Sequence, residues 1–221
     1  MDTQKLNDWK EKADKLLESS RDFMISTDNK TFARGIIGEL LTFSQLISKY
    51  ERELIFNENK IKYYGSSKKG YDFKLSLNGC DIEIDSKATT NYVKQKPRWV
   101  RQHARKFCEF LDNQDGTKNI IPRKDNFFYI YVDVKKWLDD SKADFYILSN
   151  YETIEEFGSY YKQFAETYEL DHNGEKRKSD DMWVEYDSIK KYKDNDLTVL
   201  KKYSENKSTN NDVATSPGNH R

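Results

Sequence analysis

The sequence predicts an α/β protein with a mixed central β-sheet flanked by helices. Two observations lead to this expectation. Apolar residues recur at helical spacing through the first 50 residues and again after residue 150, whereas the segments between them carry short apolar runs typical of strands. The expected order is helix, helix, three strands, helix, two strands and helix. Such an order is typical of a sheet whose faces are covered by helices.

Two amphipathic helices are expected at the N-terminus. The first runs from residue 3 to about residue 19, and the second begins at Thr27 or Asp28, either of which suits an N-cap, and continues to about residue 50. The apolar face of the second helix holds Phe32, Ile36, Leu40, Phe43 and Ile47. Gly35 and Gly38 lower its helix propensity, so we expect them to allow close packing.

The middle of the chain should form the sheet. Residues 60–65 are a short strand candidate, and residues 70–90 are typical of a β-hairpin with an Asn78-Gly79 turn. A helix is expected over 98–112. Two further strands follow at 126–134, which carries the strongest strand signal, and at 143–149.

The C-terminal part should return to helix. An aromatic-rich helix opens at Asn150 or Thr153, and residues 182–192 suggest a short strand and a helical turn. From Ser204 onward the chain has almost no apolar content, which predicts a disordered tail over 204–221. The rest should be one domain, with N-terminal helices at 3–50, a sheet core at about 60–150, and a C-terminal helix and strand at 151–203.

Composition restricts the class of protein. Aromatic residues make up 14% of the chain and supply enough bulk for a folded core, and the charges balance at 38 basic and 38 acidic residues. Any surface that binds a polyanion must therefore be local. Two cysteines match neither a disulfide framework nor a zinc pattern. With no apolar run of membrane-spanning length and no glycine-rich phosphate loop, we expect a cytoplasmic protein without a nucleotide cofactor.

The predicted hairpin concentrates acids on one face. Because alternate residues of a strand point the same way, Glu83, Asp85 and Lys87 share the face opposite to Ile82 and Ile84. A tight turn brings Asp72 of the preceding strand into the same neighbourhood. Carboxylates crowded in this way repel one another, and a divalent cation relieves that repulsion. Mg²⁺, with Mn²⁺ as a substitute, suits such a set of oxygen ligands.

These residues resemble the motif of the PD-(D/E)xK nuclease superfamily. Asp72 is followed by Asp85-Ser86-Lys87 at the end of the next strand, and Glu39 lies on a helix before the sheet, where many members carry a further acid. The resemblance implies a restriction-endonuclease-like core in which Asp72, Asp85 and Glu39 bind metal and Lys87 assists the water and the phosphate. Glu83, on the same face, is an additional candidate ligand. Gly70-Tyr71 replaces the proline of the motif.

The implied activity is metal-dependent hydrolysis of double-stranded DNA. A type II restriction enzyme or a related defence or mobile-element nuclease fits one catalytic domain of this size. Cutting both strands would call for a homodimer. The alternative is a non-catalytic DNA-binding or interaction protein with a nuclease-like sheet, in which Asp72, Asp85 and Lys87 are surface charges.

The acid-x-Lys pattern also occurs elsewhere in this highly charged chain. Only the copies that begin at Asp85 and Asp133 close a predicted strand, and only the copy at Asp85 follows a strand with its own aspartate. The competing interpretation is a solvent-facing hairpin whose charges keep a sheet edge soluble.

A basic run follows the hairpin. It contains no acid and comprises Lys94, Lys96, Arg98, Arg101, Arg105 and Lys106. In a chain of zero net charge this is a local patch suited to DNA phosphates. Taken alone, the run is better explained as an exposed helix face; next to the acid cluster, it favours DNA binding.

Overall fold

The fold was analysed in a computed structural model. The structure describes residues 3–26, 30–56, 60–65, 70–89, 99–103, 108–115, 118–165, 168–170, 176–178 and 181–214.

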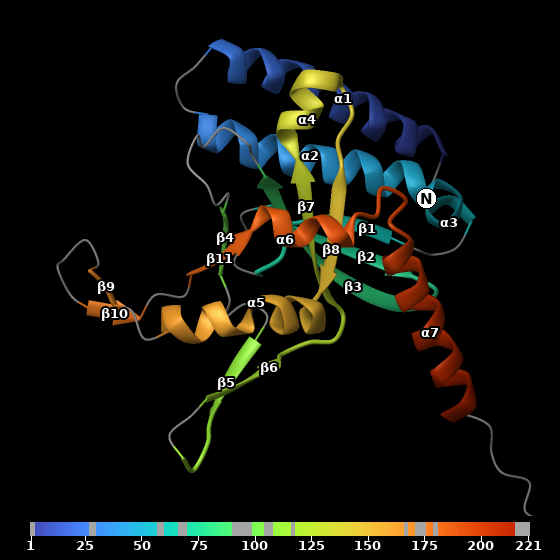
Figure 1. The fold of residues 1–221 in the computed structure, drawn as a ribbon. Helices are drawn as coiled ribbons and strands as arrows, with labels where there is room; N and C mark the ends of the chain where they lie inside the picture. Colours follow the sequence, from blue (N-terminus) through green and yellow to red (C-terminus); the bar gives the residue numbers. More distant parts are fainter. Residues whose placement is uncertain are drawn as a thin grey trace, which may run out of the picture.

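The centre of the molecule is a five-stranded sheet with the order β1-β2-β3-β7-β8 (Figure 1). All neighbouring strands are antiparallel except β3 and β7, which are parallel. The predicted mixed sheet in an α/β fold is thus confirmed. The strands are β1 (Lys60–Tyr63), β2 (Phe73–Leu77), β3 (Cys80–Thr89), β7 (Phe127–Asp133) and β8 (Phe145–Ser149).

The β2–β3 hairpin forms where the sequence predicts it. Asn78 and Gly79 both have positive φ, at 51° and 74°, as a two-residue turn that follows the strand twist requires. In β3 the register pairs Phe73 with Ile84 and Leu75 with Ile82. The hairpin is flanked by β1 on one side and β7 on the other, so β3 is an interior strand.

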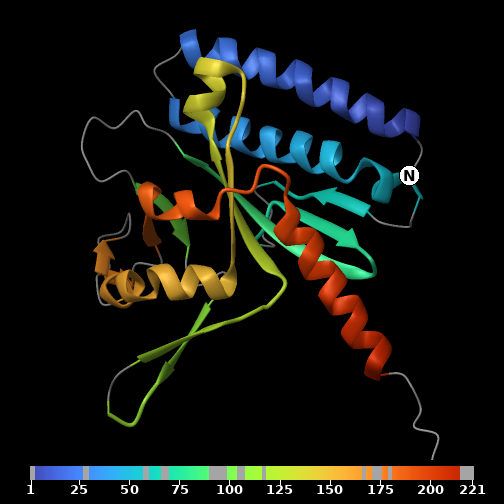
Figure 2. The same ribbon diagram turned by 45° about the vertical axis from the view of Figure 1, so that its right-hand side comes forward.

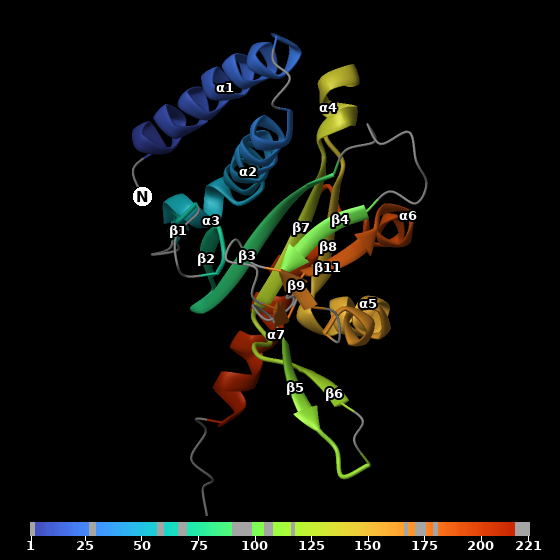
Figure 3. The same cartoon turned by 90° about the vertical axis from the view of Figure 1, so that its left-hand side faces the viewer.

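Helices cover both faces of the sheet (Figure 3). On one face, α2 contacts β3 and β7, α1 packs on α2, and α7 contacts β3; on the other face, α5 contacts β7 and β8. None of the described helices is long and apolar enough to cross a membrane. The helices are α1 (Thr3–Ser26), α2 (Lys30–Lys49), α3 (Glu51–Phe56), α4 (Val134–Asp140), α5 (Asn150–Ala165), α6 (Tyr186–Ile189), the 3₁₀ helix η2 (Lys190–Tyr192) and α7 (Thr198–Ala214).

Strand β7 separates two hydrophobic clusters. All seven of its residues are buried, as expected for a strand covered on both faces. Phe128, Ile130 and Val132 face the α2 side, whereas Phe127, Tyr129 and Tyr131 face the α5 side. On β3, Ile82 and Ile84 belong to the same cluster as Phe128 on the α2 side, whereas on the opposite face Asp81 is exposed and Glu83 is partly buried.

Close packing of α2 on β3 depends on Gly38. A Cβ atom at this position would lie 3.0 Å from the Cβ of Ala88, so a larger residue would push the helix away from the strand. Thr42, one turn further along, shares a buried 2.8 Å hydrogen bond with Ser86. These contacts confirm close packing at Gly38. Gly35 is exposed and has no neighbour of this kind.

The helix expected over 98–112 is wrong. The structure has β4 (Trp99–His103), paired with β11 (Asp181–Glu185), and β5 (Cys108–Asp112), paired with β6 (Lys118–Pro122). Aromatic and β-branched residues favour strands once partner strands are present, and apolar spacing in a short segment does not separate the two states. The β5–β6 hairpin extends beyond α5 (Figure 2). A further pair joins β9 (Tyr168–Leu170) and β10 (Lys176–Lys178).

The disordered tail expected from Ser204 is also wrong as far as residue 214, because α7 continues to Ala214. Ser204 is fully buried, its hydroxyl accepts a 3.1 Å hydrogen bond from the Asn78 side chain, and Ser208 donates to the Asn78 carbonyl at 2.8 Å. The helix is thus stabilised by contacts with the distant hairpin turn. Residues 215–221 lie outside the described part of the chain.

Candidate active site

The hairpin places Asp72 directly beside β3. The Asp72 amide donates to the Ile84 carbonyl at 2.9 Å, and its carboxylate oxygen Oδ2 accepts from the Ser86 amide at 2.8 Å. Continuing the β2–β3 register by one residue sets Asp72 opposite Asp85. Gly70, with φ of 84°, allows the backbone to turn immediately before this point.

Asp85 and Lys87 lie on the face of β3 that is covered by the α5 side of the molecule. Asp85 is paired with Tyr129 of β7 in the parallel register and is only 1% exposed. The Lys87 ammonium nitrogen lies 2.7 Å from Asp85 Oδ2. This contact is close enough for an ion pair but lacks hydrogen-bond geometry, since Oδ2 has no hydrogen-bond partner in the described part of the chain. A buried carboxylate oxygen left in this state is costly.

The pKa of Asp72 is strongly raised in the folded protein. Burial, followed by repulsion from the Asp85 charge, raises the pKa of Asp72 to about 8, although Lys87 acts in the opposite direction. The carboxyl groups of Asp72 and Asp85 are in hydrogen-bond contact. Without a cation, Asp72 is therefore mostly protonated at neutral pH. Burial also raises the pKa of the adjacent Tyr129 hydroxyl well above its ordinary value.

Glu39 approaches the same pair from α2. Its carboxylate raises the pKa of Asp72, which places it within electrostatic range. Its Oε2 accepts a hydrogen bond from the hydroxyl of Tyr63, the last residue of β1. Glu39 and Tyr63 also line an apolar cavity of about 810 Å³ between α1, α2 and β1. Glu39 thus lies between this cavity and the aspartate pair.

Glu83 has a different partner. It forms an ion pair of 2.5 Å with Lys124, and the Lys124 ammonium also lies over the Tyr71 ring. The structure therefore brings Asp72, Asp85 and Lys87 together, with Glu39 acting on the Asp72 charge less strongly than Asp85 or Lys87 does, and it gives Glu83 a cation of its own.

A divalent metal fits the aspartate pair. No group of three or more His, Cys, Asp or Glu side chains among the described residues is close enough to form a complete metal site. Mg²⁺, however, takes one or two carboxylates and completes its shell with water and phosphate. Asp72 and Asp85 supply such a pair. The raised pKa of Asp72 and the unsatisfied Asp85 oxygen are the features that a bound cation would relieve.

The basic run falls largely outside the described residues. Arg101 lies on β4, and its side chain is not described. The other members, Lys94, Lys96, Arg98, Arg105 and Lys106, lie between the described segments. Their binding to DNA stays a prediction.

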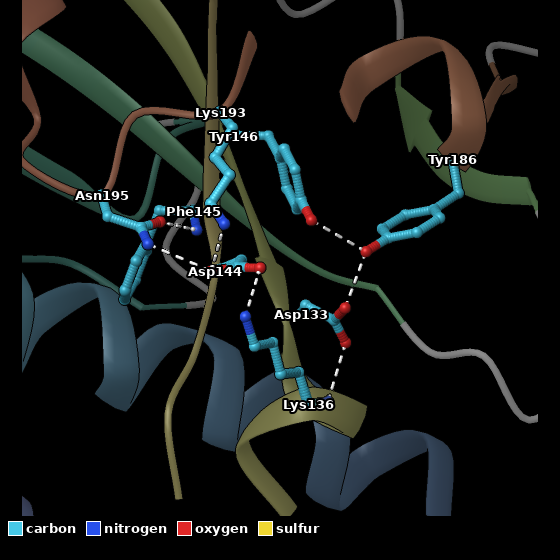
Figure 4. A network of polar contacts seen from close by, with 8 residues as sticks. All are labelled: Asp133, Lys136, Asp144, Phe145, Tyr146, Tyr186, Lys193 and Asn195. Atoms are coloured by element: carbon cyan, nitrogen blue, oxygen red, sulfur yellow. Dashed lines mark hydrogen bonds and ion pairs between the residues drawn. The ribbon is translucent and has the colours of Figure 1, made fainter. Parts of the chain in front are cut away.

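The other acid-x-Lys sequence that follows a strand, Asp133-Val134-Lys135 at the end of β7, has a structural role (Figure 4). Asp133 caps α4 by accepting from the Lys136 amide at 2.9 Å, and its other oxygen accepts from the Tyr186 hydroxyl at 2.7 Å. Tyr186 in turn shares a 3.0 Å hydrogen bond with Tyr146 of β8. Lys135 pairs with Asp139 on its own helix. This copy therefore ties the end of β7 to α4 and α6.

A neighbouring ion cluster secures the start of β8. Asp144 contacts the ammonium groups of Lys136 at 2.7 Å and Lys193 at 2.9 Å, and it accepts from the Asn195 side chain at 3.0 Å. Asn195 also accepts from the Phe145 amide (Figure 4). Burial acts to raise the pKa of Asp144, but these hydrogen bonds outweigh it and hold that pKa at about 2. Asp144 is thus a fully satisfied anion, unlike Asp85.

Comparison with known proteins gave a likeness in structure and none in sequence. No protein-family model matches the sequence, and no curated protein matches it. Among solved structures, a bacterial homing endonuclease, I-Ssp6803I, is similar over 82% of this chain and 99% of its own, with 11% sequence identity and a TM-score of 0.39.

Two residues at the site could not be found from the sequence. Tyr63 and Tyr129 belong to strands that are separated from the motif by turns and loops. Their distance in sequence from Asp72 and Asp85 matches no pattern that would identify them as site residues. Only the strand order β1-β2-β3-β7 brings them beside the carboxylates. One sequence feature could have pointed to Tyr129. The uninterrupted apolar run of β7 is typical of a strand buried on both faces, and such a strand is expected next to the hairpin in the sheet.

Proposed function

We propose that this protein is a Mg²⁺-dependent DNA endonuclease that hydrolyses phosphodiester bonds. The observation that carries the proposal is a pair of adjacent aspartates, the half-buried Asp72 and the buried Asp85, with the Lys87 ammonium 2.7 Å from Asp85 and no hydrogen bond to that carboxylate oxygen within the described residues. The pattern resembles the PD-(D/E)xK motif, and Glu39 is within electrostatic range of Asp72.

The position of the hairpin speaks against the competing interpretation. Charges that protect a sheet from aggregation belong on edge strands and face solvent. Strand β3 is interior to the sheet, and Asp85 is almost completely buried. Burial of two carboxylates side by side destabilises a protein. This cost is expected where the carboxylates serve a bound cation.

Each residue then has a chemical task. Asp72 and Asp85 would hold the divalent ion, with Glu39 as a further ligand; the bound ion would lower the pKa of water and draw charge from the phosphate oxygens. Lys87 places a positive charge next to the reacting phosphate, where it orients the attacking water and stabilises negative charge that builds up on oxygen. The buried Tyr129 packs beneath Asp85 and keeps bulk water from that side.

The partner and assembly follow from the reaction. Hydrolysis of both strands of double-stranded DNA with one site per chain requires two chains, so we propose a homodimer. The basic run from Lys94 to Lys106 would contact phosphates. A type II restriction enzyme, or a related defence or mobile-element nuclease, is the class proposed.

Nicking of supercoiled plasmid by the pure protein tests the proposal. We expect cleavage with Mg²⁺, none with a chelator, and a loss of about 100-fold or more for Lys87→Ala, the scale for removing one charge-stabilising donor. Lys74→Ala is the matched control, because Lys74 lies on the same hairpin but pairs with the exposed Asp81. Equal cleavage by the Lys87 and Lys74 variants, or cleavage that persists in chelator, would refute it.

A further inference from the structure

Tyr63 connects two parts of the candidate site. Its hydroxyl donates to Glu39 Oε2. Its ring lies 5.2 Å from that of Phe73, which is opposite it in the β1–β2 register and directly follows Asp72. The next residue, Tyr64, donates its amide to the Asp72 carbonyl at 2.7 Å. One short strand therefore contacts both the helix that carries Glu39 and the segment that carries Asp72.

The hydroxyl is also confined from the far side. Gly65 follows with φ of +54°, and a Cβ atom there would lie 3.0 Å from the Tyr63 hydroxyl oxygen. Only glycine adopts this backbone conformation at low cost while leaving room for the phenol. Three independent features, namely the Phe73 ring, the β1 register and the Gly65 turn, thus fix the hydroxyl against Glu39.

Packing into the core does not explain this arrangement. Tyr63 is 58% exposed, so its ring adds little to the stability of the core. Glu39 is half-buried and lines the apolar cavity, and a glutamate side chain in such a place can still adopt several rotamers. The Tyr63 hydroxyl holds one oxygen of that carboxylate and leaves the other, Oε1, for a further partner.

We propose that Tyr63 is a positioning residue that orients Glu39 for the divalent cation. The inference rests on the proposed function and adds a residue to it. Residues that hydrogen-bond to a metal ligand fix its orientation, and their removal typically weakens metal affinity about 10- to 100-fold. Tyr63 acts on the cation through Glu39, with no role in the hydrolysis itself.

The test is calorimetric titration of Ca²⁺ into the full-length protein, compared between wild type and Tyr63→Phe. This substitution keeps the ring and removes the hydroxyl. We expect about a 10-fold loss of Ca²⁺ affinity, with the melting temperature of the cation-free protein nearly unchanged. Tyr64→Phe is the matched control, since Tyr64 is the adjacent tyrosine but makes its side-chain hydrogen bond to Tyr71, and it should bind like wild type.

A double-variant cycle separates positioning from general damage. In a Glu39→Gln background, Tyr63→Phe should cause no further loss of Ca²⁺ affinity, because the two residues act as a unit. Gly65→Ala, which keeps the phenol but crowds its hydroxyl, should also weaken binding. Cleavage by Tyr63→Phe should need about 10-fold more Mg²⁺ for half its maximal rate while approaching the wild-type rate at saturation.

The outcomes are distinguishable. If wild type binds Ca²⁺ and Asp85→Asn does not, but Tyr63→Phe matches wild type, the positioning role is wrong and the proposed nuclease site stands. Additive losses from Glu39→Gln and Tyr63→Phe would equally overturn it. A wild-type protein that neither binds a divalent cation nor cleaves DNA would overturn the proposed function together with this inference.

Discussion

Replacing Asp72 with asparagine should stabilise the cation-free protein, and the gain should grow with pH. The folded-state pKa of Asp72 is about 8, against an ordinary value of 3.8. Between these values the folded protein keeps a proton that the unfolded chain has lost. The contribution of this group to stability is therefore greatest below about pH 4 and falls as pH rises towards 8. The amide of the variant has no proton to lose in this range, so residue 72 no longer makes the stability of the variant depend on pH.

The magnitude follows from the proton count. One proton bound only by the folded state changes the free energy of unfolding by about 1.4 kcal/mol per pH unit. The difference in unfolding free energy between Asp72→Asn and wild type should therefore rise with about this slope from pH 4.5 to pH 7.5. The ceiling across the whole window, from 3.8 to about 8, is about 6 kcal/mol. Titrating groups that do not interact with Asp72 are common to both proteins and cancel, whereas Asp85 and Lys87, which act on Asp72, do not.

Urea unfolding in a chelating buffer at several pH values measures this difference. Asp81→Asn is the control on the same hairpin. Hydrogen bonds from Lys74 and Ser76 lower the pKa of Asp81, so its effect on stability should be lost only at acidic pH and stay flat from pH 5 to 8. A flat difference for Asp72→Asn over this range, or a variant less stable than wild type at pH 8, would refute the reasoning from paired buried carboxylates.

Three further changes probe other parts of the structure. Asp133→Ala removes the α4 cap and the acceptor of the Tyr186 hydroxyl, and should cost about 2 to 3 kcal/mol in urea unfolding while cleavage per folded molecule is unchanged; lost cleavage with full stability would contradict its structural role. Deleting residues 204–221 removes two hydrogen bonds to the Asn78 turn and should cost about 2 kcal/mol, so an unaltered thermal melt would show that this part of α7 contributes nothing. Replacing Arg101 and Arg105 with Ala should weaken DNA binding for every sequence and reduce the salt slope by about one unit per lost phosphate contact, as measured by fluorescence anisotropy; an unchanged slope would remove both from the DNA surface.

Local patterns in the sequence predicted the parts of the fold that depend on local chemistry. The Asn78-Gly79 turn and the strand alternation around Ile82 and Ile84 defined the hairpin, and the unbroken apolar run at 126–134 defined β7. The segment 98–112 could not be assigned in this way, because its conformation depends on β6 and β11, which lie elsewhere in the chain. The prediction of disorder for residues 204–214 was wrong for a related reason, because their helix is stabilised by a turn more than 120 residues away.

The candidate site likewise has a part that local sequence predicts and a part that depends on distant segments. Asp72, Asp85 and Lys87 lie on two strands joined by a short turn, so their spacing was visible in the sequence. The sequence does not show which groups surround these acids. In the described part of the chain, the ring next to Asp85 comes from β7, the cation paired with Glu83 is Lys124, and the hydroxyl bound to Glu39 comes from β1. Both Asp85 and Asp133 are buried, so only their hydrogen-bond partners decide between them, and spacing in the sequence does not provide these.

The parallel pairing of β3 with β7 has a consequence for the order of folding. The β2–β3 hairpin needs only a short turn and can form early, with Asp85 still in water, whereas β7 must be brought back across some forty residues of chain. Most of the cost of the carboxylate pair, which comes from burial, therefore arises only when β7 and α2 enclose the hairpin. Because this step comes late, neutralising Asp85 should slow unfolding while leaving the folding rate nearly unchanged. The pair of carboxylates, Asp72 and Asp85, would then set the unfolding rate, and so the lifetime of the native protein, more than the rate at which it forms.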